Sequence, residues 1–155
     1  MKNKTTAAQA AKQIRQVLKK NFPDVLFRVK SKSYSMGNRV RIGWDNGPTN
    51  KQVEEIVMDY QYGSFDGMTD CYNYTNSRDD IPQVKHVICD RNITEDIYQR
   101  SFEFGKKYLS SFEKINNIDE YGTEGRPRDL LWKYITKIDF RQDFTFEVFR
   151  QAVLN

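Results

Sequence analysis

Cationic side chains alternate with apolar ones in two neighbouring segments, residues 25–32 and 39–44, which are typical of a β-hairpin. Side chains of a strand point alternately to its two faces, so the cations share one face of this hairpin. They are Arg28, Lys30, Lys32, Arg39 and Arg41. Like charges that face each other across strands repel, so this face favours an anionic partner. Contacts with phosphates would bind nucleic acid without reading its sequence.

The distribution of charge along the chain supports an anion-binding side. The net charge is +4, but residues 1–51 hold 12 Lys and Arg against 2 acidic residues, a balance of +10. Residues 52–155 hold 13 Lys and Arg against 19 acidic residues, a balance of −6. Surfaces usually mix both signs. An ordinary solvated sheet face is the alternative, and the scarcity of acids near the hairpin argues against it.

Further residues extend the candidate surface. Tyr34 lies at the end of the first strand, where its ring could stack on a base. On the preceding helix, Lys12, Arg15 and Lys19 lie opposite the apolar side and would make secondary contacts. If the partner is a protein, the same surface would meet an acidic patch or the nucleic-acid groove of a nucleoprotein.

Asp66 and Asp70 are the second candidates for chemistry. Two carboxylates could hold Mg²⁺, which prefers oxygen ligands, and a metal-dependent nuclease would follow from such a site. The alternative is a structural Asp-Gly turn with Phe65 and Met68 in the core, and we favour it. We therefore expect no catalytic residue, no metal and no other cofactor.

The other reactive groups form no catalytic pattern. His86 is the only histidine, and a structural role is favoured for it. Cys71 and Cys89 are expected to be free thiols, and with one histidine they are too few for a typical structural zinc site. The stretch around Tyr72 and Tyr74 forms either a binding interface or a half-buried aromatic layer.

An α+β fold must position these residues. Capping boxes at Thr6-x-x-Gln9 and Thr49-x-x-Gln52 predict two helices. Strands are expected at residues 25–32, 39–44, 71–74 and 84–89. The order α-β-β-α-β-β predicts an antiparallel sheet with both helices on one face and the basic face open to solvent.

Residues 92–155 are expected to form a helical extension to a core domain of residues 1–91. Helices are predicted at residues 94–112, 128–138 and 145–154. This extension would buttress the sheet, or bind a protein, or form a homodimer. No apolar run approaches the ~18–20 residues that span a bilayer, and the N-terminus lacks the apolar core of a signal peptide. A cytoplasmic protein without membrane contact is expected.

Three segments carry a resemblance to a known family: residues 29–35, 40–49 and 63–70. They contain the turn Trp44-x-x-Gly47-Pro48-Thr49 and the run Ser-Phe-Asp-Gly-Met, in order and at suitable spacing. Over about residues 5–90 the chain resembles the large polyvalent protein associated domain family, number twenty-nine. Its modules occur in phages and conjugative elements. The family has no established reaction, so the resemblance transfers no catalytic residue.

The resemblance implies a mobile-element protein acting in a bacterial host, where such proteins often blunt restriction and CRISPR systems. We expect a non-enzymatic, anti-CRISPR-like protein that inhibits a host nucleic-acid-targeting defence by occluding a nucleic-acid or nucleoprotein surface. Its partner would be the effector complex or its nucleic acid. Two alternatives stay open: a general DNA- or RNA-binding accessory protein, and the metal-dependent nuclease.

Overall fold

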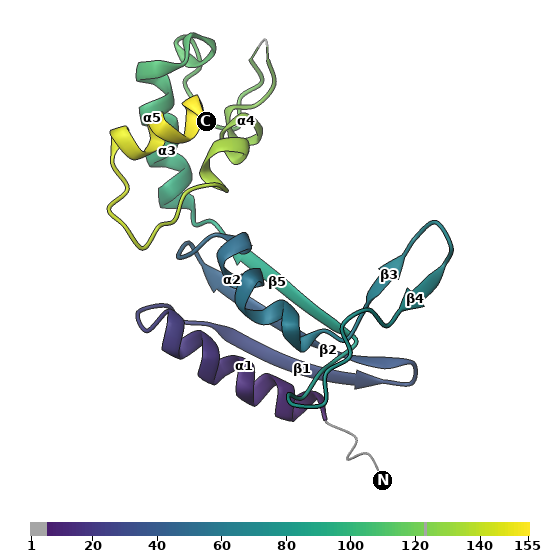
Figure 1. Ribbon diagram of the computed structural model, residues 1–155. Coiled ribbons are helices and arrows are strands. Elements are labelled where there is room, and N and C mark those ends of the chain that lie inside the picture. The colour runs from purple at the N-terminus through teal and green to yellow at the C-terminus, as the bar shows by residue number, and fades with distance from the viewer. Residues whose placement is uncertain (1–5, 123) are drawn as a thin grey trace. The chain divides into compact units, whose positions relative to one another are not determined.

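The computed structural model describes residues 6–122 and 124–155, which divide into two compact units (Figure 1). The first comprises the described residues up to Trp44 together with Asn50–Arg91. The second comprises Asp45–Thr49 and Asn92–Asn155. The expected domains, residues 1–91 and 92–155, stay a prediction. The second unit differs from the expected second domain because it also includes Asp45–Thr49.

The first unit is built on a three-stranded sheet in the order β1–β2–β5. β1 (Arg28–Tyr34) and β2 (Gly37–Asp45) form the predicted antiparallel hairpin. β5 (His86–Asn92) lies on the other side of β2. The α+β fold class is therefore confirmed.

β5 runs in the same direction as β2, which makes the sheet mixed. Near the start of both strands, the Lys85 backbone N–H donates to Asn38 Oδ1 at 2.8 Å. Further along both strands, Arg41 pairs with Asp90. Parallel neighbours cannot be joined by a tight turn. The long connection between β2 and β5 contains a helix, and Figure 1 shows that helix crossing the sheet.

Two helices cover one face of this sheet, as the sequence predicted (Figure 1). α1 (Ala7–Asn21) begins at the expected capping box, because Gln9 N–H donates to Thr6 Oγ1 and Thr6 N–H donates to Gln9 Oε1. α2 (Asn50–Val57) continues into the short 3₁₀ helix η1 (Met58–Tyr60). The core between helices and sheet contains the fully buried side chains of Ile14, Leu18, Val40, Ile42, Trp44, Val53 and Val57.

A second, two-stranded sheet lies within the first unit. β3 (Ser64–Asp66) pairs antiparallel with β4 (Cys71–Asn73). The sequence predicted a strand near residues 71–74 but placed it in the main sheet, and it treated residues 64–70 as a turn alone. Phe65 and Met68 were expected in the core, and this is wrong: they are 57% and 97% exposed.

The second unit is helical, as expected. It contains α3 (Glu95–Tyr108), the 3₁₀ helix η2 (Ser110–Phe112), α4 (Pro127–Ile135) and α5 (Phe146–Leu154). Its core centres on four fully buried side chains: Phe112, Leu131, Ile135 and Phe149. A homodimer through these helices stays a prediction. Among the described residues, no helix has both the length and the apolar character needed to cross a membrane.

Candidate nucleic-acid interface

The register of the hairpin brings the five predicted cations to the sheet face opposite the helices. Lys30 lies opposite Arg41, Lys32 opposite Arg39, and Arg28 opposite Gly43. The alternate residues Val29, Val40 and Ile42 are buried in the core. Residues directly opposite each other in an antiparallel pair share a face. We call the surface formed by Arg28, Lys30, Lys32, Arg39 and Arg41 the basic face.

Three of the five cations of the basic face have no acidic partner among the described residues. Arg41 Nε lies 2.8 Å from Asp90 Oδ2, and both side chains are at least half exposed. Within the described part of the chain, Lys30, Lys32 and Arg39 form no ion pair with a carboxylate. Three cations therefore face solvent with their charge uncompensated.

His86, at the start of β5, lies near cations of this surface. Burial lowers the pKa of its imidazole, and the nearby charges of Lys85 and Arg39 lower that pKa further. His86 is therefore neutral at pH 7. It becomes charged only at a pH below the ordinary histidine value of 6.5.

The predicted secondary residues belong to a different surface. Lys12, Arg15 and Lys19 lie on the solvent side of α1, which packs on the core side of the sheet. Arg15 Nη2 donates to the backbone oxygen of Val29 at 2.6 Å, so it satisfies a carbonyl on the outer edge of β1. The structure thus gives Arg15 a structural contact and separates all three residues from the basic face.

Aromatic rings gather at the end of the sheet where β5 begins. The Tyr62 and Tyr74 rings stack with centroids 5.5 Å apart, and Tyr72 meets them edge-on at 5.7 and 5.3 Å. Tyr72 Oη donates to the Lys85 backbone oxygen at 2.6 Å. Burial, followed by the other tyrosines including Tyr34, raises the pKa of Tyr72 to about 12, so its hydroxyl keeps its proton. We call Tyr34, Tyr62, Tyr72 and Tyr74 the tyrosine cluster.

The absence of a side chain at Gly63 makes this packing possible. A Cβ atom there would lie 2.2 Å from the Asn73 backbone oxygen and 2.6 Å from Tyr72 Cε1. Both separations are far below van der Waals contact. Gly63 therefore lets the β3–β4 hairpin approach the rest of the unit closely enough for its tyrosines to meet Tyr62.

The tyrosine cluster adjoins the basic face. Lys85 Nζ lies 5.1 Å from the centroid of the Tyr72 ring, and His86 meets the same ring edge-on at 5.7 Å. Lys85 and His86 lead into β5, next to Arg39 on β2. The sequence suggested a possible interface around Tyr72 and Tyr74 but gave no sign that Lys85 lies beside them, because the cluster joins segments that are far apart in the chain.

Asp66 and Asp70, the two candidate metal ligands, lie at the turn between β3 and β4. Both oxygens of Asp66 are engaged, since they accept hydrogen bonds from Met68 N–H and Thr69 Oγ1, each at 2.9 Å. These bonds lower the pKa of Asp66. Asp70 has a φ of +53°, a turn conformation that aspartate tolerates. In the described ranges, no group of three or more His, Cys, Asp or Glu could hold a metal ion. The turn interpretation therefore accounts for both residues.

The cysteines show no sign of a reactive pair. Both Cys71 and Cys89 are free, as expected. Burial is the main cause that raises the pKa of Cys89 to about 12, and the charges of Glu54 and Asp90 add to it. The Cys89 thiol is thus protonated and a poor nucleophile at neutral pH.

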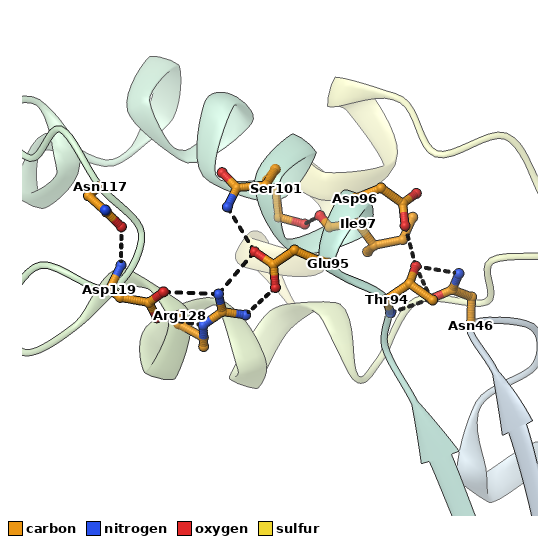
Figure 2. Close-up of polar contacts among 10 residues, drawn as sticks. Asn46, Thr94, Glu95, Asp96, Ile97, Ser101, Asn117, Asp119 and Arg128 are labelled. Carbon is orange, nitrogen blue, oxygen red and sulfur yellow. Dashed lines mark hydrogen bonds and ion pairs between the residues drawn. The ribbon is translucent and has the colours of Figure 1, made fainter.

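The Trp-x-x-Gly-Pro-Thr turn has a structural role in the second unit. Asn46 and Gly47 adopt φ values of +51° and +50°. Asn46 Oδ1 accepts from Thr94 N–H at 3.0 Å, and Asn46 Nδ2 donates to Thr94 Oγ1 at 2.8 Å (Figure 2). Phe140 N–H also donates to the Gly47 backbone oxygen at 2.9 Å. The turn therefore anchors the start of α3, and it contributes no group to the basic face.

Comparisons with known proteins place the chain in a family. No curated protein matches it, and no solved structure does. The family model described as Large polyvalent protein associated domain 29 matches residues 5–101, which is most of the chain. This match covers the basic face, the tyrosine cluster and the Asn46–Thr94 contact. The chain therefore belongs to the large polyvalent protein associated domain 29 family, whose members are modules associated with phages and mobile elements.

Proposed function

We propose that this protein is a non-enzymatic, anti-CRISPR-like binding protein that inhibits a host nucleic-acid-targeting defence. It acts in the cytoplasm of the bacterial host. Its basic face covers a nucleic-acid or nucleoprotein surface that the defence effector complex needs for reaching its target. The observation that carries the proposal is an open sheet face on which Lys30, Lys32 and Arg39 have no carboxylate partner.

Uncompensated cations gain more from an anionic partner than paired ones. A cation that already pairs with a carboxylate must give up or share that contact when a phosphate approaches. Lys30, Lys32 and Arg39 lose no such contact, and a polyanion also relieves the repulsion between opposing cations such as Lys32 and Arg39. Release of counterions from the nucleic acid adds to the affinity and makes it depend on salt.

Charge reversal on the basic face tests the proposal. The tagged full chain is used to capture effector complexes from a bacterial host with an active CRISPR system. In the face variant, Lys30, Lys32 and Arg39 are each replaced by Glu. In the control, Lys107, Lys114 and Lys133, which are exposed in the second unit, are replaced by Glu. Both variants change the net charge by the same amount.

We expect the face variant to capture at least about 10-fold less effector than the wild type, because reversed charges repel phosphates. The control is expected to capture as much as the wild type. In the same host, wild type and control should protect a targeted plasmid, and the face variant should not. Equal capture by the face variant and the wild type would contradict the proposal.

A general DNA- or RNA-binding accessory protein is the second candidate, because the same open cations would also bind free nucleic acid. The two functions predict different results for effector capture and for protection of the plasmid. An accessory protein binds naked nucleic acid with a steep salt dependence, captures no effector and does not protect the plasmid. An inhibitor protects it.

A further inference from the structure

A cavity of about 360 Å³ lies in the first unit, where the first turn of α1 meets the β1–β2 hairpin. Two members of the tyrosine cluster, Tyr34 and Tyr62, contribute to its walls. The polar residues that line it are Thr6, Ser33, Ser35 and Asn38. Most of these residues are exposed, so the cavity is open to solvent.

The aromatic walls are held in position before any ligand binds. Tyr62 is stacked by Tyr74 and met edge-on by Tyr72. Tyr34 lies against its cross-strand partner Gly37, where an added Cβ would be 3.3 Å from Tyr34 Cε2. Tyr34 nevertheless remains 41% exposed. A planar ligand could therefore stack on a ring that loses little freedom on binding.

Asn38 supplies a directed hydrogen-bond donor to the cavity. Its Oδ1 accepts from the Lys85 backbone N–H at 2.8 Å, and because that backbone group can only donate, the orientation of the amide follows. Nδ2 of Asn38 forms no hydrogen bond with the described residues, so its two N–H groups remain for a ligand. Every nucleobase has acceptor atoms on its edges that such a donor can meet.

We propose that this cavity binds an unpaired base of a single-stranded nucleic acid whose phosphates lie on the basic face. The inference rests on the proposed function for the phosphate contacts and adds the class of nucleic acid. Aromatic rings beside a cationic surface are the usual means of binding single strands, because every base offers a face for stacking. In a duplex the bases are already stacked and paired, so their faces are not available to Tyr34 and Tyr62.

The test separates bases from phosphates. Binding of the full chain is measured by fluorescence anisotropy with oligothymidine, an abasic strand of the same length, the corresponding duplex and oligouridine. We expect the wild type to bind oligothymidine about 10-fold more tightly than the abasic strand or the duplex. Tyr34→Ala should remove this advantage and leave the abasic affinity unchanged. Tyr34→Phe, which keeps the ring, should retain it.

A positioning variant adds a second measurement. Gly37 has no positive φ, so Gly37→Ala introduces no backbone strain there. The new methyl group would crowd Tyr34 and come within 2.7 Å of Lys85 Cδ. Oligothymidine affinity should fall by a few-fold with abasic affinity unchanged, although no binding group has been removed.

The outcomes distinguish this inference from the proposed function. Equal binding of oligothymidine and the abasic strand, or an unchanged advantage in Tyr34→Ala, would overturn the inference alone. If no strand binds, or if reversal of Lys30 leaves the abasic affinity unchanged, the phosphate contacts fail and the inference fails with them. Tyr34-dependent binding of polyglutamate would also overturn it, in favour of an acidic protein partner. Oligouridine and oligothymidine together show whether RNA or DNA is preferred.

Discussion

The arginines of the second unit and the cations of the basic face in the first unit differ in their pairing with carboxylates. In the second unit, Arg128 donates to both Glu95 and Asp119, at 2.6 to 3.2 Å (Figure 2). Other ion pairs there join Arg126 to Asp129 and Arg141 to Asp139. On the basic face of the first unit, three cations instead have no carboxylate partner among the residues that the structure describes. The scarcity of carboxylates near cations is thus a property of the basic face and not of the whole protein surface.

One cluster of aromatic rings in each unit shows a similar difference. In the second unit, Phe104 contacts Phe144, Phe146 and Phe149, and Phe149 is fully buried. In the first unit, the tyrosine cluster lies at the surface, with Tyr74 70% exposed. Groups that stabilise the fold are paired or buried, and groups left open are available for a partner. This contrast supports the proposal that the basic face and the tyrosine cluster bind a partner.

Truncating one aromatic residue in each unit should produce the largest difference. Phe149→Ala removes a fully buried ring and should lower the free energy of unfolding by about 3–5 kcal/mol. Tyr74→Ala removes an exposed ring and should cost less than about 1 kcal/mol. Chemical denaturation measures both values. A similar loss for the two variants would mean that the tyrosine cluster is part of the core.

Removing one cation in each unit should change stability less, and the two variants should affect different properties, one stability and the other nucleic-acid binding. Arg128→Gln breaks paired contacts and should destabilise the protein by about 1 kcal/mol, with no change in nucleic-acid affinity. Lys32→Gln should change stability by less than about 0.5 kcal/mol and weaken nucleic-acid binding. Denaturation and anisotropy distinguish the two. If Arg128→Gln weakened binding as much as Lys32→Gln, the contrast between the units would not hold.

The smallest effect should come from the pH dependence contributed by His86. Its folded pKa lies below the ordinary value of 6.5. As the pH falls below 6.5, the unfolded chain therefore takes up more protons than the folded chain, and stability decreases. His86→Gln should remove this part of the loss between pH 7.5 and 5.5, as measured by chemical denaturation at several pH values. An identical pH profile for variant and wild type would mean that burial and the nearby charges of Lys85 and Arg39 do not lower the pKa of His86.

Much of the fold follows from patterns within short segments. Alternation of residues in 25–32 and 39–44 predicted which side chains of the hairpin are buried, and Val29, Val40 and Ile42 confirm it. The Thr6–Gln9 capping box predicted the start of α1. These features depend on neighbours two to four positions apart, so the local sequence contains the necessary information.

Features that join distant segments were predicted less well. Phe65 and Met68 are apolar and were expected in the core, but the β3–β4 hairpin holds them in solvent. The direction of β5 was also missed, because its pairing with β2 depends on a long connection rather than on the strand itself. The turn role of Asp66 was anticipated, since an Asp-Gly pair directs hydrogen bonds to its own backbone.

The sequence by itself determined that five cations share a face, because the period of a strand places alternate side chains on the same side. Only the tertiary structure decided that Lys30, Lys32 and Arg39 have no carboxylate partner among the described residues, that Arg15 is used at the edge of β1, and that Tyr62, Tyr72 and Tyr74 meet beside the basic face. Ion pairs and ring contacts form between segments separated by tens of residues. Local periodicity carries no information about which of those segments meet.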